Sequence, residues 1–307
     1  LLHFGVKIVF CDVEEDTGNI DVTKIEELIT QKTKAIVTND QWGHPCDKDE
    51  ILNICKKYNL KYVEDCSHAH FSQYKGKYSG TFGDVACWSF QGNKLLSGGE
   101  GGILLTDDQD IYERAVLLGH NLKRPAQSVK NPSYKPLERT GFGLKLRMHT
   151  LSAVMVNHQL DNYCFDWIDS RKETLEYFEK RLSEETFLEP MTKKSYVTSM
   201  GAWYGFKPKA DFKKLGIDRK HMVKWMEERG FDISLPGSEV IPSYALFSSE
   251  EFGIQNFEKN FEFKHYPNAE KYCEKTLSFP TFTFKEFEVV DKYIDAIKEY
   301  YSEVQNK

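Results

Sequence analysis

The sequence lacks the features that mark membrane proteins, secreted proteins and nucleic-acid-binding proteins. It contains no apolar run near the roughly 18 residues that a membrane-spanning helix needs, and we expect no signal peptide. No block of lysine and arginine stands out, and the net charge of −6 disfavours binding to nucleic acid. There is also no internal repeat and no low-complexity tract. We therefore expect an ordinary globular protein without membrane or nucleic-acid partners.

The cysteines also lack a pattern. None of the seven is spaced as C-x-x-C, and their number is odd, which disfavours a disulfide framework. We expect reduced, mostly buried thiols in a cytoplasmic protein.

What the chain does contain is an alternation of strand and helix patterns. Its 307 residues exceed what one hydrophobic core usually supports, so we expect two domains, residues 1–165 and 166–307. Apolar periodicity predicts strands at 6–11, 34–39, 61–65, 84–90 and 102–106, and helices at 21–31, 47–60, 107–120 and from 150 onward. This order is typical of a parallel sheet covered by helices, which binds its ligands at the carboxyl ends of the strands. Asp65 ends the third strand and is expected at that edge.

The second half predicts a smaller α+β domain. We expect strands at 201–208 and 231–235 and helices at 219–230 and 285–303. The aromatic residues Trp203, Tyr204 and Phe206 are expected in its core.

Three residues between Asp65 and Gly102 have the chemistry to hold one cofactor, pyridoxal phosphate (PLP). This cofactor acts as an electron sink, and a carboxylate such as Asp65 can keep its pyridine nitrogen protonated. Its aldehyde carbon needs an amine that loses its proton readily, for which Lys94 is the candidate. The Ser89 hydroxyl can donate to the phosphate, and the glycine-rich run after Lys94 allows a tight turn.

The motifs in this stretch resemble those of one family. They are V-E-D-x-x-H-A, S-G-T-F-G-D-V-A-C-W-S-F and K-L-L-S-G-G-E-G-G, and they resemble the DegT/DnrJ/EryC1/StrS sugar aminotransferases, whose fold is the PLP-dependent transferase fold type I. The resemblance implies that Asp65 binds the pyridine nitrogen, Lys94 carries the cofactor and Ser89 contacts the phosphate. It also implies that His68 contacts the ring hydroxyl and that Ser67 lies against the ring face.

The resemblance extends beyond these motifs. It implies a homodimer with shared active sites, in which Lys145 or Arg147 reaches the phosphate of the other subunit; a solvated basic loop is the alternative for these two residues. The resemblance also implies a longer large domain whose N-terminal part supplies phosphate donors, and this sequence begins inside that pattern. We expect that part to be truncated here, supplied from elsewhere or lost. Unless it is replaced, we expect weak cofactor binding or poor folding.

Other signals have simpler explanations. His68 and His70 could suggest a metal pair on a strand, but no further ligands have metal spacing, so we predict no metal site. The glycine-rich runs match neither nucleotide-binding fingerprint.

By resemblance, the function expected is that of a PLP-dependent transaminase. It would move an amino group from glutamate or glutamine to a keto-sugar, usually nucleotide-linked, or to a keto-cyclitol, with Lys94 as general base. One alternative is a PLP-dependent sugar dehydratase, in which family members replace the lysine by histidine, so Lys94 argues against it. A second alternative is a non-catalytic scaffold or partner subunit, suggested by the absent N-terminal part.

Overall fold

The computed structural model describes residues 5–236, 239–248 and 265–306. The chain divides into two compact units. The sheet unit comprises residues 34–168 and 198–204, and the terminal unit comprises residues 1–33, 169–197 and 205–307. The domain division proposed from length, at residues 165 and 166, remains a proposal. None of the helices among the described residues combines the length and apolar character needed to cross a membrane.

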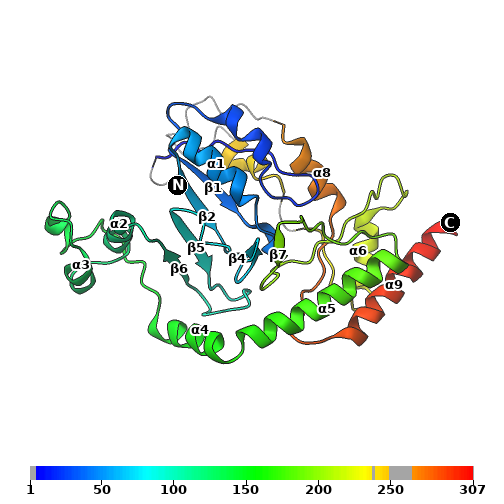
Figure 1. Cartoon of the computed structure of the whole chain (residues 1–307). Coiled ribbons are helices and arrows are strands. Elements are labelled where there is room, and N and C mark those ends of the chain that lie inside the picture. The colour runs from blue at the N-terminus through cyan, green and yellow to red at the C-terminus, as the bar shows by residue number, and fades with distance from the viewer. Residues whose placement is uncertain (1–4, 237–238, 249–264, 307) are drawn as a thin grey trace. The chain divides into compact units, whose positions relative to one another are not determined.

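The sheet unit carries the strands predicted at 34–39, 61–65, 84–90 and 102–106 and the helices predicted at 47–60 and 107–120, together with short elements that were not predicted (Figure 1). In chain order they are β1 (Ala35–Asn39), η4 (Gln41–Gly43), α1 (Lys48–Tyr58), β2 (Lys61–Asp65), β3 (Gln73–Tyr74), β4 (Lys77–Tyr78), β5 (Val85–Ser89), β6 (Gly102–Leu105), α2 (Gln109–Gly119), α3 (Lys123–Ser128), η5 (Lys135–Leu137) and α4 (Thr150–Asn162). The arrows of β1, β2, β5 and β6 lie side by side in Figure 1, in that order.

This four-stranded sheet is mostly parallel. β1 pairs with β2 and β2 with β5 in parallel, while β6 pairs antiparallel to β5. In β2, Tyr62 and Glu64 are buried and alternate with less buried residues, which is the period of two that a strand dictates. Asp65 lies in register with Asn39 on one side and Cys87 on the other, at the carboxyl edge of the sheet. The predicted α/β fold class with a mainly parallel sheet is confirmed.

Helix α1 shows why the local prediction succeeded. Asp47 caps its first turn by accepting a hydrogen bond from the backbone N–H of Glu50, at 3.4 Å. Ile51, Ile54 and Cys55 form its buried face. The helix ends at Asn59, whose left-handed backbone (φ 52°) provides the C-terminal cap.

Two N-terminal predictions are wrong. Residues 6–11 form no strand, and Val6 and Val9 are 45% and 55% exposed, because no neighbouring strand pairs with this segment. The helix predicted at 21–31 is reduced to two short 3-10 turns, η2 (Val22–Lys24) and η3 (Glu26–Leu28), because Ile29 has extended backbone.

Three predictions further along the chain also need correction. The helix that starts at Thr150 is broken at Tyr163, where α4 ends and α5 (Cys164–Glu185) begins. Residues 201–208 form turns and isolated bridges rather than a strand, since Gly201 and Trp203 have positive φ values of 54° and 42°. Residues 231–235 contribute only a single bridge, between Ser234 and Ser278.

The terminal unit packs helices around an aromatic core. Besides most of α5, its elements are α6 (Arg219–Glu227), η6 (Ile241–Ser243), α7 (Ala245–Ser248), α8 (Pro267–Lys275) and α9 (Phe287–Gln305). The short strand β7 (Val197–Ser199) spans the boundary between the units, with Thr198 and Ser199 in the sheet unit. Phe178 of α5 contacts Phe206, Phe279 and Tyr293, with ring centroids 5.0 to 5.8 Å apart. The helices predicted at 219–230 and 285–303 are confirmed.

Candidate active site

Asp65 is held at the carboxyl end of β2 by its own backbone and by its neighbours. Its carbonyl oxygen accepts a hydrogen bond from the backbone N–H of Asp40, at 3.1 Å. Its carboxylate accepts one from the backbone N–H of Ser67, at 2.9 Å. The next residue, Cys66, donates its backbone N–H to Cys87 on β5. These bonds fix the carboxylate at the sheet edge and bring Ser67 beside it.

Ser89 lies at the corresponding end of β5, the neighbouring strand. Its hydroxyl oxygen accepts a hydrogen bond from the backbone N–H of Gln91, at 3.2 Å. Its carbonyl oxygen lies 2.9 Å from Nε2 of His70. Because a carbonyl oxygen only accepts, the neutral imidazole carries its hydrogen on Nε2 and donates it here. Because β2 and β5 are parallel neighbours, Asp65 and Ser89 lie on adjacent strand ends of the same edge.

Lys94 lies in the loop that joins β5 to β6. This loop is closed by hydrogen bonds from Phe90 N–H to the Gly101 carbonyl and from Gly98 N–H to the Phe90 carbonyl, at 2.9 and 2.8 Å. Gly99 has a φ of 81°, which suits glycine and permits the turn. The loop therefore returns the chain to β6 while presenting the lysine beside the strand ends.

Electrostatics link Lys94 to Asp65. Burial lowers the pKa of the Lys94 amine from its ordinary value of 10.5, and the negative charge of Asp65 acts in the opposite direction. Lys94 thus has an amine of lowered pKa, as expected for a lysine that holds PLP, and the charge of Asp65 acts on it.

His68 lies near Lys94, in the turn that follows β2. Its ring stacks on Tyr204 with centroids 4.0 Å apart, and on Trp42 with centroids 5.2 Å apart. The Lys94 ammonium lies 3.7 Å from the centroid of the Tyr204 ring.

Sequence reasoning missed Tyr204. The prediction of a core position holds for its neighbours Trp203 and Phe206, which are 1% and 0% exposed, but Tyr204 is only half-buried. Its hydroxyl oxygen accepts a hydrogen bond from the side chain of Asn93, the residue before Lys94, at 2.9 Å. No local signal identifies this contact, because it joins residues more than a hundred positions apart.

The structure does not bring Lys145 and Arg147 into this cluster. Both side chains are exposed on the segment before α4, and neither makes a hydrogen bond or ion pair with the described residues. Their predicted role, in which one of them reaches a second subunit, stays a prediction.

Behind Asp65 lies a buried group of charges. The ammonium of Lys48 is 2.6 Å from a carboxylate oxygen of Asp40 and 3.0 Å from one of Glu64, and all three side chains are at most 1% exposed. Glu64 also accepts hydrogen bonds from the backbone N–H groups of Gly80, Phe82 and Gly83 at 2.7 to 3.0 Å, so it fixes the loop before β5.

This charged group has the contacts of an ion pair network, and we still predict no metal there. The ligand atoms of Asp40, Glu64 and Cys66 do lie within 4.8 Å of one another. However, burial raises the pKa of the Cys66 thiol, which therefore stays protonated, and Lys48 already supplies the neutralising cation.

His70 makes a pH dependence of stability predictable. Burial lowers its pKa from 6.5 to about 4, so the unfolded chain binds more protons than the folded chain between these two pH values. Stability contributed by neutral His70 is therefore complete above pH 6.5 and is lost as the pH falls toward 4. We expect the free energy of unfolding to fall by about 3 kcal/mol between pH 6.5 and pH 4 because of His70, and we expect the His70→Gln variant not to show this contribution. Denaturant unfolding at both pH values measures it, and His265→Gln, at an exposed position, should retain the wild-type loss.

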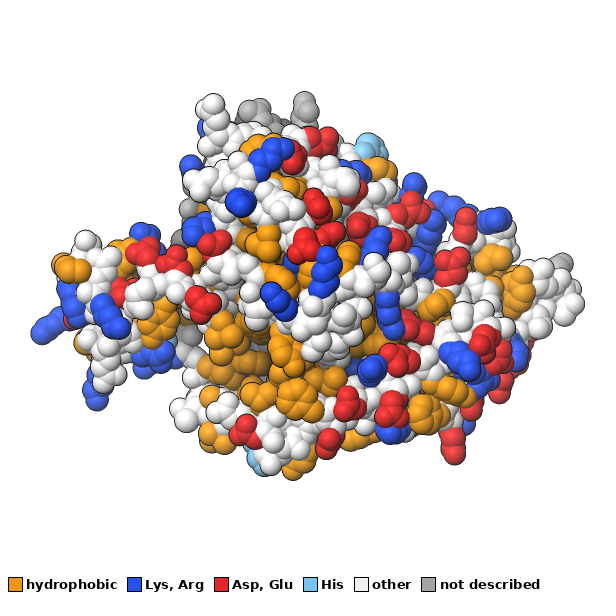
Figure 2. Space-filling view, in the orientation of Figure 1, with side chains coloured by type: hydrophobic (Ala, Val, Ile, Leu, Met, Phe, Trp, Pro, Cys, Tyr) orange, Lys and Arg blue, Asp and Glu red, His pale blue; other side chains and the backbone are white. Residues whose placement is uncertain are grey.

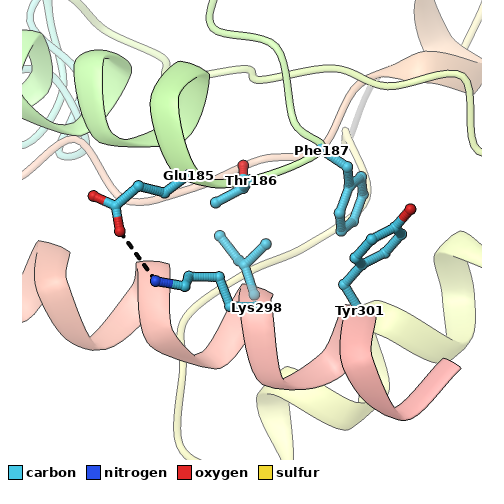
Figure 3. A pocket seen from close by; sticks show the side chains of 6 residues that line it. Glu185, Thr186, Phe187, Lys298 and Tyr301 are labelled. Atoms are coloured by element: carbon cyan, nitrogen blue, oxygen red, sulfur yellow. Dashed lines mark hydrogen bonds and ion pairs between the residues drawn. The ribbon is translucent and has the colours of Figure 1, made fainter. Parts of the chain in front are cut away.

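A separate cavity of about 290 Å³ lies between the end of α5 and α9 (Figure 3). Lys298 projects into it and pairs with Glu185 at 3.1 Å, while the rings of Phe187 and Tyr301 lie 5.0 Å apart. Every residue that lines it belongs to the terminal unit, so the cavity is not part of the cluster around Lys94.

Comparisons with known proteins agree on one family. Residues 1–298 match the model of the DegT/DnrJ/EryC1/StrS aminotransferase family. The spore coat polysaccharide biosynthesis protein SpsC of Bacillus subtilis is 29% identical over 97% of this chain and 75% of its own length. GDP-perosamine synthase of Escherichia coli O157:H7 is 35% identical over 59% of this chain and 47% of its own length. A putative L-glutamine:3-amino-2,3-dideoxy-scyllo-inosose aminotransferase of Micromonospora echinospora is 34% identical over 56% of this chain and 39% of its own length.

Solved structures show the same fold. An aminotransferase from Psychrobacter cryohalolentis superposes with a TM-score of 0.85 at 24% identity, covering 99% of this chain and 78% of its own. A GDP-4-keto-6-deoxy-D-mannose-3-dehydratase from E. coli with bound hydrated PLP superposes with a TM-score of 0.78 at 23% identity, covering 96% of this chain and 75% of its own.

Proposed function

The chain belongs to the DegT/DnrJ/EryC1/StrS aminotransferase family, and we propose that it moves an amino group from glutamate or glutamine to a keto-sugar or keto-cyclitol. It is a transaminase, and its cofactor is PLP. A nucleotide-linked sugar is the favoured acceptor, because one relative is a GDP-perosamine synthase. The relative named for an aminoinosose supports a cyclitol as the second choice and glutamine as a donor.

The residues of the sheet unit fit this cofactor. A carboxylate, Asp65, and a hydroxyl, Ser89, lie at the ends of adjacent parallel strands, and Lys94 follows on the next loop. The observation that carries the proposal is the position of Lys94 on the loop that follows Ser89, at the strand-end edge that also holds Asp65, whose charge acts on the partly buried amine. PLP needs, at one site, a carboxylate that keeps its pyridine nitrogen protonated and an amine that loses its proton readily.

Each residue then has a distinct task. PLP, when bound, supplies an electron sink for the carbon that gains or loses the amino group. Asp65 would hold the proton on the pyridine nitrogen, and Ser89 would donate to the phosphate. Ser67 and His68 would contact the ring. Lys94 would hold the cofactor and would take up and return a proton at its Nζ atom as general base.

Two alternative functions remain distinct from this proposal. A dehydratase shares the fold, as the E. coli neighbour shows, but the family resemblance places a histidine at the lysine position of dehydratases, and this chain has Lys94 there. A non-catalytic scaffold is the other alternative, and it predicts a protein that does not bind PLP covalently.

We also propose a homodimer with shared active sites. Several large apolar side chains of β6 and α4 are exposed. The exposed fractions of Ile103, Leu105, Leu151 and Val154 are 44 to 69%, and Figure 2 shows hydrophobic side chains gathered on this face. Surfaces of this kind mark protein interfaces. The segment 121–148 carries seven lysine and arginine residues against one acidic residue, which suits a phosphate of the other subunit. Lys145 or Arg147 would supply that contact.

We further propose a reducing compartment, the cytoplasm. All seven cysteines are free thiols in the structure, and a disulfide framework would be the usual sign of an oxidising environment.

One experiment separates the three functions. We expect the purified full chain with PLP to show the visible absorbance of lysine-bound cofactor, and glutamate or glutamine to convert it to the pyridoxamine form. Whichever of glutamate and glutamine converts the bound cofactor faster is the preferred amino donor. Conversion without later transfer to a keto-sugar, but with loss of a sugar hydroxyl, would identify a dehydratase. A protein that stays colourless with excess PLP would support the scaffold.

A further inference from the structure

The aromatic ring of Tyr204 covers the amine that the proposed function depends on. Its centroid lies 3.7 Å from Nζ of Lys94, which is the distance of a close cation–π contact. The His68 ring lies 4.0 Å from the same centroid at an interplanar angle of 22°. Both Lys94 and His68 therefore contact the ring of Tyr204.

The backbone holds Tyr204 in this position. The segment before it docks on the turn after β2, where the N–H of Ala202 donates to the carbonyl of His70 at 2.7 Å. Gly201 packs so closely there that a Cβ atom would lie 2.2 Å from the same carbonyl oxygen. Because Asn93 also binds the Tyr204 hydroxyl, both ends of the side chain are fixed.

We propose that Tyr204 is a positioning residue for Lys94. The face of the Tyr204 ring holds the free ammonium of Lys94 and favours the protonated form of that amine. The role of Lys94 in catalysis rests on the proposed function, whereas the contact itself does not. In that function the amine of Lys94 would be free for part of each cycle, and the ring would give it a defined place where the charge of Asp65 acts on it.

Several groups act on the charge of Lys94. Asp65, on β2, stabilises the ammonium, and burial destabilises it. His68 and His70 come from the turn after β2; His70 is neutral above pH 4, because burial lowers its pKa to about 4. The Tyr204 ring therefore adds to Asp65 in opposing the effect of burial.

The test is the pKa of Lys94 in the protein without PLP, measured by competitive acetylation and peptide mass spectrometry. We expect Tyr204→Leu to lower this pKa by about one pH unit, since an apolar side chain of similar bulk removes the cation–π contact. Tyr204→Phe keeps the ring and should leave the value nearly unchanged. Asn93→Ala removes the partner of the hydroxyl but not the ring, and should also leave it unchanged.

A second series guards against a variant that does not fold. Stepwise fluorination of a phenylalanine at position 204 withdraws negative charge from the ring face with little change in shape, and should lower the pKa of Lys94 in steps. Lys34, an exposed lysine of the sheet unit, is the internal reference and should not respond. An unchanged Lys94 pKa in Tyr204→Leu or across the fluorinated series would overturn the proposal. A lowered pKa in a protein that shows no transaminase activity would keep this inference and reject the proposed function.

Discussion

Replacing Lys94 by alanine is expected to reduce the rate of amino transfer by at least a hundredfold and up to about 10⁴-fold, the usual contribution of a general base. The same change removes the only described amine that lies beside Asp65 with a lowered pKa. Covalent attachment of PLP should therefore be lost as well. Steady-state rates with the preferred donor measure the first effect. Borohydride reduction followed by peptide mass spectrometry measures the second, with the added mass on the peptide that contains Lys94.

The controls for this prediction separate chemistry from folding. Lys94→Arg keeps the positive charge but not a readily deprotonated amine, so it should be nearly as inactive as the alanine variant. Added methylamine should restore part of the activity of Lys94→Ala, because it supplies an amine at the vacated position. A cofactor label found on another lysine in the wild-type protein would refute the assignment, provided that both variants show the wild-type unfolding curve.

Replacing Lys48 by alanine is expected to lower the free energy of unfolding by about 3 to 5 kcal/mol. The ammonium of this lysine lies 2.6 Å from a carboxylate oxygen of Asp40 and 3.0 Å from one of Glu64, and none of the three side chains is more than 1% exposed. Without the ammonium, two negative charges remain in the interior with no cation to pair with them. Burial opposes the charge of Lys48, yet the two carboxylates and Tyr62 raise its pKa well above 10.5, so it stays charged.

A matched exposed pair provides the control. Lys213 and Glu274 are also 2.7 Å apart, but their side chains are 81% and 56% exposed. Lys213→Ala should change stability by no more than about 0.5 kcal/mol, because water screens the pair. The double variant Asp40→Asn with Lys48→Met should recover part of the loss, since it removes a charge together with its partner. Equal losses for Lys48→Ala and Lys213→Ala in urea unfolding would show that the buried network does not stabilise the fold.

Where the prediction succeeded, the signal was local. Strand β2 and helix α1 follow from alternating burial and from the caps at Asp47 and Asn59, which each act within a few residues. The strand predicted at residues 6–11 failed because β propensity alone does not make a strand when no neighbour pairs with it. The strand predicted at 201–208 failed because docking on the turn after β2 requires the positive φ of Gly201.

Local patterns were enough to predict most strands and helices of the sheet unit, the position of Asp65 at a strand end and Lys94 as the candidate amine. Motif spacing and hydrophobic period depend only on residues close together in the chain, so they can be read directly. Which distant side chains contact these residues could be seen only in the folded chain. Tyr204 comes to lie on Lys94, and Lys48 becomes the buried partner of Glu64, because folding brings together segments that no local pattern relates.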